Sequence, residues 1–206
     1  IALITDAGTP GISDPGEDLV RICYEQGIEV TSLPGAAACI TALTLSGLPT
    51  RRFSFEAFLP KEKKERAAVL EELKNDTRTL IVYEAPHHLL GTLKELQNAL
   101  GDRRLTVCRE LTKKFETAFQ TTFSEAIRYY EEQGVRGECV LVIEGRSREE
   151  LVQEAQQSWE AISVEEHMEH YLSTGMDRKS AMKQVAKDRG VGKREIYQML
   201  LKAENE

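Results

Sequence analysis

The sequence predicts an α/β protein with a helical extension at its C-terminal end. Across residues 1–145, short apolar runs alternate with segments whose apolar residues recur at helical spacing, as in folds that pack helices on a sheet. Beyond this stretch only helical patterns occur. The charged connection PKEKKE at 60–65 divides the α/β part. We therefore expect an α/β lobe over 1–60, a second over 61–146 and a helical extension over 147–206.

The first lobe is expected to contain three strands and two helices. Each strand is a short apolar run bounded by turn residues, and each helix carries apolar residues on one face. In chain order, the elements are a strand over 1–5, a helix over 17–26, a strand over 28–33, a helix over 36–46 and a strand over 54–59. The first helix is expected to direct Leu19, Val20 and Ile22–Cys23 toward the core and to stop at Gly27.

The second lobe is expected to contain three helices and four strands. Its clearest helix spans 86–100, because leucines recur there at spacings of four, three and four residues before the exit at Gly101. The other helices are predicted up to residue 74 and around 126–133. The strands are predicted over 79–83, 105–108, 119–123 and 139–143.

Composition and charge place the chain among globular proteins. Its 206 residues carry a formal charge of −7, and 30% charged with 6% aromatic residues excludes collagen-like and disulfide-scaffold classes. No apolar run approaches the ~20 residues that a membrane-spanning helix needs. The four cysteines stand alone, without metal-ligand spacing, and we expect them to be buried thiols in a reducing compartment. These observations predict a cytoplasmic protein with no membrane partner and no metal site.

The helical extension ends in a predicted helix-turn-helix unit. It opens with helices over 149–161 and 163–172, the second of which starts at a capping box. Two further helices flank the tight turn at 190–192. Apolar residues on both are expected to pack together; they are Ala181, Val185, Ala186, Ile196, Met199 and Leu200.

The end of the chain is basic although the whole chain is acidic. Residues 177–202 hold eight Lys or Arg side chains against three acidic ones, a local charge of +5. A helix-turn-helix unit can set its second helix, here basic at Lys193 and Arg194, against a nucleic acid backbone. A helical cap with a solvated basic face explains the same pattern equally well.

The densest chemical signal is the segment TDAGTPGISDPG at 5–16. It leaves a predicted strand and leads into a helix, which is where open α/β sheets bind ligands. Its glycines and prolines expose a rigid backbone, and Asp6, Thr9, Ser13 and Asp14 supply oxygens without a lysine or arginine. It lacks the phosphate-binding glycine motifs, so we expect a cationic, hydroxylated ligand such as a sulfonium nucleoside. The alternative is a purely structural turn.

Several consecutive motifs resemble one enzyme family. They are DAGTPGISDPG, LPGAAACITAL, GLPTRRFSFEAFLPK, RTLIVYEAPHHLL, CRELTKKFE and GECVLVIEG. In this order they are similar to the tetrapyrrole-methylase-like family of S-adenosylmethionine-dependent methyltransferases, and within it to enzymes that methylate the 2′-oxygen of a cytidine in the 16S ribosomal RNA of the small subunit. The resemblance implies a two-lobed α/β fold, a homodimer and a cofactor cleft between the lobes, and the basic helix pair is similar to the family's C-terminal extension.

The sequence departs from the family pattern at two places. Relatives open with a strand and a T-P-I-G-N loop, which are absent before Asp6, so residues 1–60 resemble the remainder of a first lobe. Relatives also carry Pro-Ser where Ala36-Ala37 follow Pro34-Gly35, and loss of the serine hydroxyl removes an expected cofactor contact.

The resemblance implies which residues bind S-adenosylmethionine. They lie in the first loop, in the second glycine turn and at two strand ends of the second lobe. The expected cofactor residues are Asp6, Gly8, Thr9, Pro10, Ile12, Ser13, Asp14, Pro34, Gly35, Ala36, Ala37, Tyr83, Glu84 and Arg109.

The charged cluster after the strand at 105–108 is the candidate for catalysis. Glu110 can accept a proton, while Arg109 and Lys113 can polarise a hydroxyl or hold phosphate. A surface salt-bridge set is the alternative, and the neighbouring His87-His88 pair ranks below this cluster as a base. The basic residues expected to meet RNA are Arg66, Lys113, Lys193 and Arg194.

These observations favour methylation of a ribose hydroxyl in ribosomal RNA. Two alternatives stay open. The same fold can methylate a corrin-type or other small substrate, and the basic helix pair can belong to a nucleic-acid-binding module without catalysis. The basic extension and the charged cluster after the 105–108 strand favour RNA among these.

Overall fold

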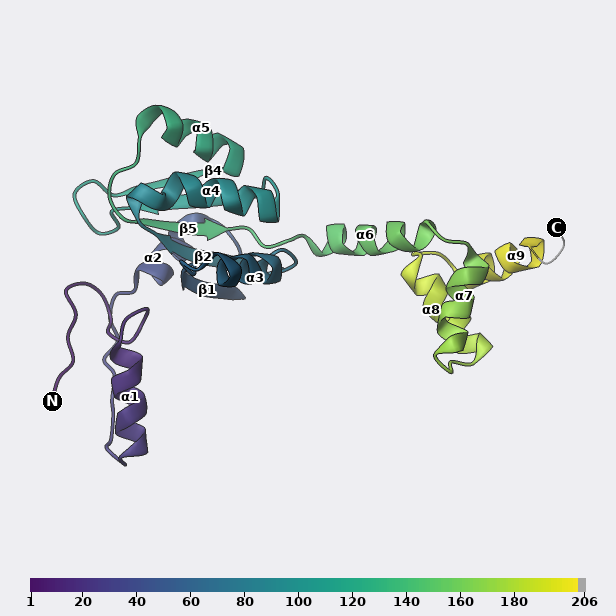
Figure 1. Ribbon diagram of the computed structural model, residues 1–206, viewed down its shortest axis with the longest axis horizontal. Coiled ribbons are helices and arrows are strands. Elements are labelled where there is room, and N and C mark those ends of the chain that lie inside the picture. Colours follow the sequence, from purple (N-terminus) through teal and green to yellow (C-terminus); the bar gives the residue numbers. More distant parts are fainter. Residues whose placement is uncertain (204–206) are drawn as a thin grey trace. The chain divides into compact units, whose positions relative to one another are not determined.

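The computed structural model describes residues 1–203, which form two compact units divided between Arg146 and Ser147 (Figure 1). The last three positions of the predicted extension, 204–206, lie outside the described residues. In the part of the chain that is described, no helix is both long and apolar enough to cross a membrane.

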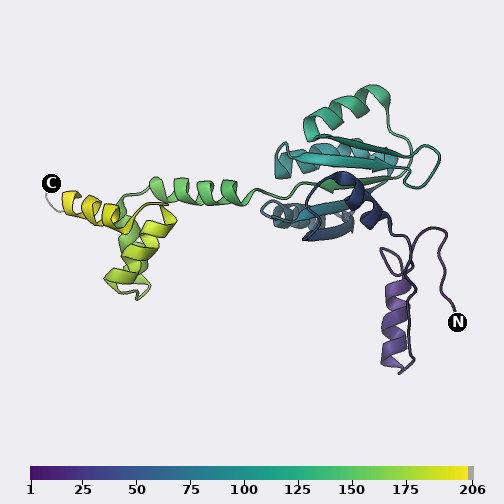
Figure 2. The same cartoon turned by 180° about the vertical axis from the view of Figure 1, so that it is seen from behind.

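A five-stranded mixed sheet forms the centre of the first unit (Figure 2). In chain order its strands are β1 (Phe53–Phe58), β2 (Thr79–Glu84), β3 (Arg104–Arg109), β4 (Thr117–Thr122) and β5 (Cys139–Ile143). The spatial order is β1-β2-β5-β3-β4; β1 and β2 are parallel, and the other neighbours are antiparallel. Because β5 runs opposite to both β2 and β3, the start of β5 lies at the edge where those two strands end.

Strand β1 belongs to this same sheet. Its position in the sequence predicts a place in the first lobe, but it pairs with β2 from Phe53 opposite Thr79 to Phe58 opposite Tyr83. The lobe boundary at residue 60 stays a prediction, while the sheet itself extends across that boundary.

Helices cover both faces of the sheet. On one face, α3 (Lys63–Leu73) and α4 (Pro86–Leu100) bury leucines against alternate strand residues, and α5 (Phe123–Gln133) buries Phe123, Ala126 and Tyr130 there. On the other, α2 (Ala38–Ser46) packs on a smaller cluster. Alternation along β5 divides its residues, with Leu141 in the larger cluster and Val142 in the smaller one. The predicted leucine stripe of α4 is confirmed, since Leu89, Leu93 and Leu96 are fully buried.

Two predicted strands of the N-terminal segment are wrong. Helix α1 (Gly16–Glu25) forms, but residues 1–5 and 28–33 are irregular. A strand needs a hydrogen-bonded neighbour, and the described residues provide none for either run. The prediction that α1 directs Leu19 and Ile22 inward is also wrong, because the described residues place no sheet behind that face; the two side chains are 42% and 46% exposed.

Three of the four free cysteines are buried as predicted, namely Cys39, Cys108 and Cys139. Burial raises the pKa of the Cys108 thiol to about 11 and that of Cys139 to about 12, so both stay protonated near neutral pH. Cys23 is only partly buried because it lies on α1.

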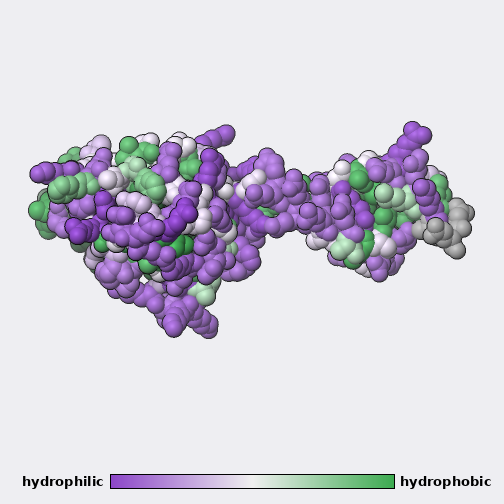
Figure 3. Space-filling model, turned by 90° about the horizontal axis from the view of Figure 1, so that it is seen from above, coloured by the Kyte–Doolittle hydropathy of each residue, from purple (hydrophilic) through white to green (hydrophobic). Residues whose placement is uncertain are grey.

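The second unit is a bundle of α6 (Arg148–Glu160), α7 (Val164–Ser173), α8 (Arg178–Asp188) and α9 (Lys193–Ala203). The predicted capping box is present, with Ser163 and Glu166 exchanging hydrogen bonds at the start of α7. The helix-turn-helix core also forms, but Met199 is 39% exposed and lies outside it, because it lies off the face that carries the buried Ile196 and Leu200. The surface over α6 is mostly hydrophilic (Figure 3).

A buried polar network joins three helices of this second unit. The His167 ring stacks on Trp159 at 3.8 Å between centroids, and the side chain of His167 is fully buried. Arg189 Nε donates to His167 Nδ1 at 3.2 Å, which leaves Nε2 to carry the proton 3.4 Å from Asp188 Oδ2. Tyr171 donates to the same Asp188 oxygen at 2.6 Å.

Candidate active site

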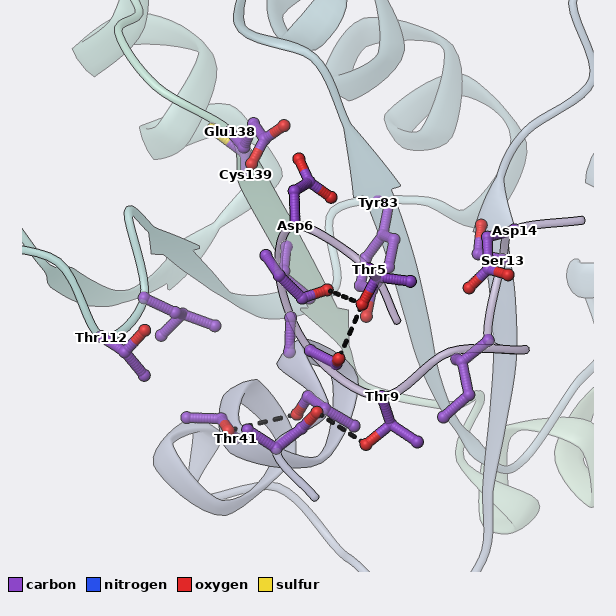
Figure 4. Close-up of a pocket in the computed structure, with 18 of the residues that line it drawn as sticks. Thr5, Asp6, Thr9, Ser13, Asp14, Thr41, Tyr83, Thr112, Glu138 and Cys139 are labelled. Carbon is purple, nitrogen blue, oxygen red and sulfur yellow. Dashed lines mark hydrogen bonds between the residues drawn. The ribbon is translucent and has the colours of Figure 1, made fainter. Parts of the chain in front are cut away.

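A pocket of about 420 Å³ opens at the edge of the sheet where β2 and β3 end and β5 begins (Figure 4). Its walls come from the N-terminal loop, the start of α2, the strand ends and the loop after β3. The lining residues are 5–9, 12–14, 36–38, 41, 58, 83–84, 110–113 and 138–140.

The first wall is the loop over residues 5–14, which is hydrogen-bonded to the segment before α2. Thr9 donates to the Ala36 carbonyl through both its amide, at 2.9 Å, and its Oγ1, at 3.0 Å. Thr5 Oγ1 donates to the Gly8 carbonyl at 2.8 Å, as Figure 4 also shows. Gly8 has a φ of +77°, and a side chain there would come within 3.2 Å of the Ala36 oxygen. The glycine thus permits the close approach of the two segments.

Asp14 holds the turn that leads into α1. Its carboxylate accepts from the amides of Gly11, at 2.8 Å, and Gly16, at 2.7 Å. A side chain at Gly16 would come within 2.7 Å of the same carboxylate. Asp14 borders the pocket, but its oxygens already accept these two backbone hydrogen bonds, so its direct role is to shape the loop.

The second wall is the start of α2. Its N-cap residue, Ala37, supplies no side-chain hydrogen bond to the first turn. The Cys39 amide instead donates to the Tyr83 hydroxyl at 2.9 Å. Burial raises the pKa of Tyr83 to about 12, so this hydroxyl keeps its proton and remains able to donate it to a ligand. The Tyr83 ring packs edge-on against Phe55 and Phe58.

The opposite wall carries three charged side chains. Glu110 Oε1 accepts from Lys113 Nζ at 3.2 Å and from the Glu138 amide at 3.1 Å. Lys113 also lies 3.8 Å from the Glu138 carboxylate. Glu110 and Thr112 have φ values of +51° and +64°, a conformation that costs about 1–3 kcal/mol at each residue and occurs often at functional sites. The loop beside the pocket is therefore both charged and conformationally strained.

Glu84 lies behind the pocket in a network of hydrogen bonds that reaches α3. Its carboxylate accepts from the Ala85 amide at 2.8 Å and from Thr92 Oγ1 at 2.5 Å. Thr92 in turn accepts from Arg66 at 2.8 Å, and Arg66 pairs with Glu95 at 2.5 Å. Glu84 and Thr92 are buried, so this network fixes the corner between β2 and α4.

The sequence profile of the family described as Tetrapyrrole (Corrin/Porphyrin) Methylases matches residues 1–127. The chain belongs to the tetrapyrrole methylase family. Members of this family are S-adenosylmethionine-dependent methyltransferases, so the predicted family, fold class and cofactor class are confirmed.

Curated relatives agree with this assignment. The chain is 48% identical to proteins of Halalkalibacterium halodurans and Bacillus subtilis that are both named Ribosomal RNA small subunit methyltransferase I. The matches cover 96% of this chain and 68% and 67% of those proteins. A protein of the same name from Synechocystis sp. is 44% identical, over 99% of this chain and 72% of its own length.

A solved structure, that of the methyltransferase CobJ, shares the fold with a TM-score of 0.51 at 20% identity. The match covers 66% of this chain and 61% of that one, so the tetrapyrrole methylase chain described here spans less than two thirds of that structure.

The pocket brings together most of the residues that the sequence assigned to cofactor and catalysis. Those that line it are Asp6, Gly8, Thr9, Ile12, Ser13, Asp14, Ala36, Ala37, Tyr83, Glu84, Glu110 and Lys113. Pro10, Pro34 and Gly35 do not line it, although Gly35 packs directly behind Thr9. Their roles stay predictions.

Arg109 lies away from the pocket, contrary to its expected position. Successive strand residues point to opposite faces, and Cys108 faces α2. Arg109 therefore points to the α4 and α5 side, where its charge lowers the pKa of Tyr130 and Cys139 against the larger effect of burial. Its Nε is buried and has no hydrogen-bond partner among the described residues.

The residues predicted to contact RNA differ in solvent exposure and in their existing hydrogen bonds. Arg66 has only 18% of its side chain exposed and bonds Glu95 and Thr92, so it braces α3 against α4. Lys113 is 54% exposed beside the pocket. Lys193 and Arg194 are exposed at the start of α9, in the second unit.

Several lining residues were missed because strand direction was unknown. Site residues are expected at strand ends, whereas the start of β5 supplies Glu138, Cys139 and Val140. Since β5 is antiparallel to β2, its start reaches the same edge. Thr41 and Phe58 had a local signal that could have found them, since they lie one turn into α2 and at the end of β1.

Proposed function

We propose that this protein transfers a methyl group from S-adenosylmethionine to the ribose 2′-oxygen of a cytidine in 16S ribosomal RNA of the small subunit. The observation that carries the proposal is the 44–48% identity to three proteins named Ribosomal RNA small subunit methyltransferase I, each matched over at least 96% of this chain. The nucleotide and the oxygen are finer than those names and come from the motif resemblance.

The pocket suits the cofactor chemically. Asp6 and Glu138 offer carboxylates to the cationic amino and sulfonium groups. The start of α2 has no side-chain cap and suits a carboxylate. Phe58 and Tyr83 offer an aromatic wall to a base. When bound, S-adenosylmethionine supplies an electrophilic methyl carbon on a sulfonium that leaves as the neutral thioether.

The protein's own residues would position the acceptor ribose and manage its proton. Positioning alone supplies much of the rate enhancement in such a displacement. Glu110 is the candidate proton acceptor, and both hydrogen bonds described for its carboxylate go to Oε1, so we assign the proton to Oε2. Lys113 would lie against the phosphate next to the target ribose.

The test is methyl transfer from labelled S-adenosylmethionine to small ribosomal subunits that lack the modification. We expect one methyl group per subunit, recovered as 2′-O-methylcytidine by mass spectrometry of nuclease digests. A cofactor-binding protein that leaves the subunits unmodified would overturn the RNA assignment.

A corrin-type substrate is the second candidate, because the family description includes corrin and porphyrin methylases. Methylation of a precorrin but not of ribosomal subunits would favour it. A protein that binds RNA and gives no calorimetric signal with S-adenosylmethionine would instead be a binding module without catalysis.

We further propose a cytoplasmic homodimer built of the three predicted parts, 1–60, 61–146 and 147–206. Sedimentation equilibrium tests the dimer, and the ribosomal substrate supports the compartment. A monomer at micromolar concentration would contradict the first of these.

A further inference from the structure

The loop between β3 and β4, residues 110–116, has one apolar side chain turned inward and one turned outward. Leu111 packs against the cluster beneath α2. Phe115 is 69% exposed. An exposed phenylalanine forgoes the free energy that burial of its ring would give, and its ring is open to contact with a ligand.

The loop is held in one conformation by its own hydrogen bonds. The Lys113 amide donates to the Glu110 carbonyl at 3.0 Å, and the Glu116 amide donates to the Lys113 carbonyl at 3.1 Å. The Glu116 carboxylate accepts from the Thr112 amide at 2.6 Å. Together with the positive φ values of Glu110 and Thr112, these contacts present Phe115 on a preorganised support.

Of the two lysines in this loop, Lys114 is the one that pairs with no carboxylate of the described residues. Glu110 and Glu138 both face Lys113, and Glu116 is turned back onto the loop. Lys114 is exposed, and its Nζ lies over one face of the Phe115 ring, 5.5 Å from the ring centre, so a base would stack on the opposite face. An aromatic face beside a cation is how proteins hold unpaired nucleotides, with the base on the ring and the phosphate on the cation.

The position of the loop relates this pair to the pocket. Thr112 and Lys113, the two residues directly before Lys114, line the pocket, and Thr112 is visible at its wall in Figure 4. A nucleotide held by Lys114 and Phe115 would therefore be a near neighbour of one that enters the pocket.

We propose that Phe115 and Lys114 dock an unpaired nucleotide of the RNA substrate, the base stacked on the Phe115 ring and its phosphate on Lys114. This inference rests on the proposed function, because it assumes that RNA is the substrate. It assigns a stacking residue to the rim of the pocket, separate from the basic helix pair of the second unit.

The test measures binding of a fluorescein-labelled single-stranded RNA of about a dozen nucleotides by anisotropy. Phe115→Ala should weaken binding about tenfold, Phe115→Leu should weaken it as much, and Phe115→Trp should restore it, because only an aromatic ring stacks on a base. Lys114→Ala should reduce the slope of log affinity against log salt by about 1. The matched control is Tyr24→Ala, which removes an equally exposed ring, 69%, from α1 and should leave affinity unchanged.

Four results would overturn the docking site. They are no RNA binding by the unmodified protein, unchanged binding by Phe115→Ala, unchanged binding by Phe115→Leu, and a change of sedimentation in Phe115→Ala, which would assign the ring to a protein interface. Calorimetric S-adenosylmethionine binding and methyl transfer separate this inference from the proposed function. If Phe115→Ala methylates ribosomal subunits as efficiently as the unmodified protein, the docking site fails and the function stands. If the unmodified protein methylates nothing, the function fails on its own.

Discussion

Helices α1 and α4 are both amphipathic, but only α4 buries its apolar face. In α4, Leu89, Leu93 and Leu96 are fully buried against the sheet. In α1, Leu19 and Ile22 remain 42% and 46% exposed, and Gly16 is the only buried residue. The difference shows that a helical pattern specifies a local conformation, while burial depends on a partner surface that other segments must supply.

The largest effect on stability is expected at the centre of α4. Leu93→Ala removes a fully buried side chain between the helix and the sheet and should lower the free energy of unfolding by about 2–5 kcal/mol. Urea titration followed by circular dichroism measures this. Leu93→Met is the volume-conserving control and should cost less than about 1.5 kcal/mol. If the alanine variant lost less than about 1 kcal/mol of unfolding free energy, neighbouring side chains would have to fill the cavity, which contradicts close packing around Leu93.

The two helices also differ in their polar contacts. Thr92→Val deletes the hydroxyl that links Glu84 to Arg66 and should destabilise the protein by about 1–3 kcal/mol, because the buried Glu84 carboxylate loses a donor. Helix α1 has only the exposed pairs of Arg21 with Asp18 and Glu25, so Arg21→Ala is the control and should leave the urea midpoint unchanged. Equal shifts for the two variants would contradict the assignment of the network as a structural anchor.

The stability of the second unit is expected to depend on pH through His167. Burial and the neighbouring Arg189 lower the pKa of His167 below its ordinary value of 6.5. The unfolded chain therefore binds a proton at a higher pH than the folded one, and stability is lost as pH falls below about 6.5. Trp159, the only tryptophan of the chain, stacks on His167 and reports this unit by fluorescence in urea at about pH 7.5 and about pH 5.5.

Two variants separate His167 from other titrating groups. His167→Gln should abolish this part of the pH dependence, even though it lowers the stability at both pH values. His170→Gln, which changes a neighbouring histidine, should retain it. An unchanged pH dependence in His167→Gln would assign the effect to another group.

How much the sequence could predict follows from how local each signal is. The bounds of α4 were predicted residue for residue, because its proline start, leucine spacing and glycine exit all lie within the helix. Whether the apolar run at 28–33 forms a strand could not be predicted, because a strand needs a hydrogen-bonded neighbour from elsewhere in the chain. Arg109 points away from the pocket because it follows Cys108 in β3, and neighbouring strand residues face opposite sides of the sheet. Glu138 lies at the pocket because β5 is antiparallel to β2. The motifs encode neither the sheet face nor the strand direction.

The smallest expected effect is at the exposed face of α1. The double variant Leu19→Gln with Ile22→Gln replaces apolar side chains that contact mostly solvent, so the free energy of unfolding from urea titration should change by less than about 0.5 kcal/mol. The same exchange at Leu89 and Leu93 should prevent folding, because it would bury four unpaired polar atoms. Lower aggregation of the α1 variant in light scattering would fit an unpartnered apolar face. A loss of several kcal/mol would instead mean that this face is covered in solution, and the contrast with α4 would then lie in the source of the partner surface rather than in its absence.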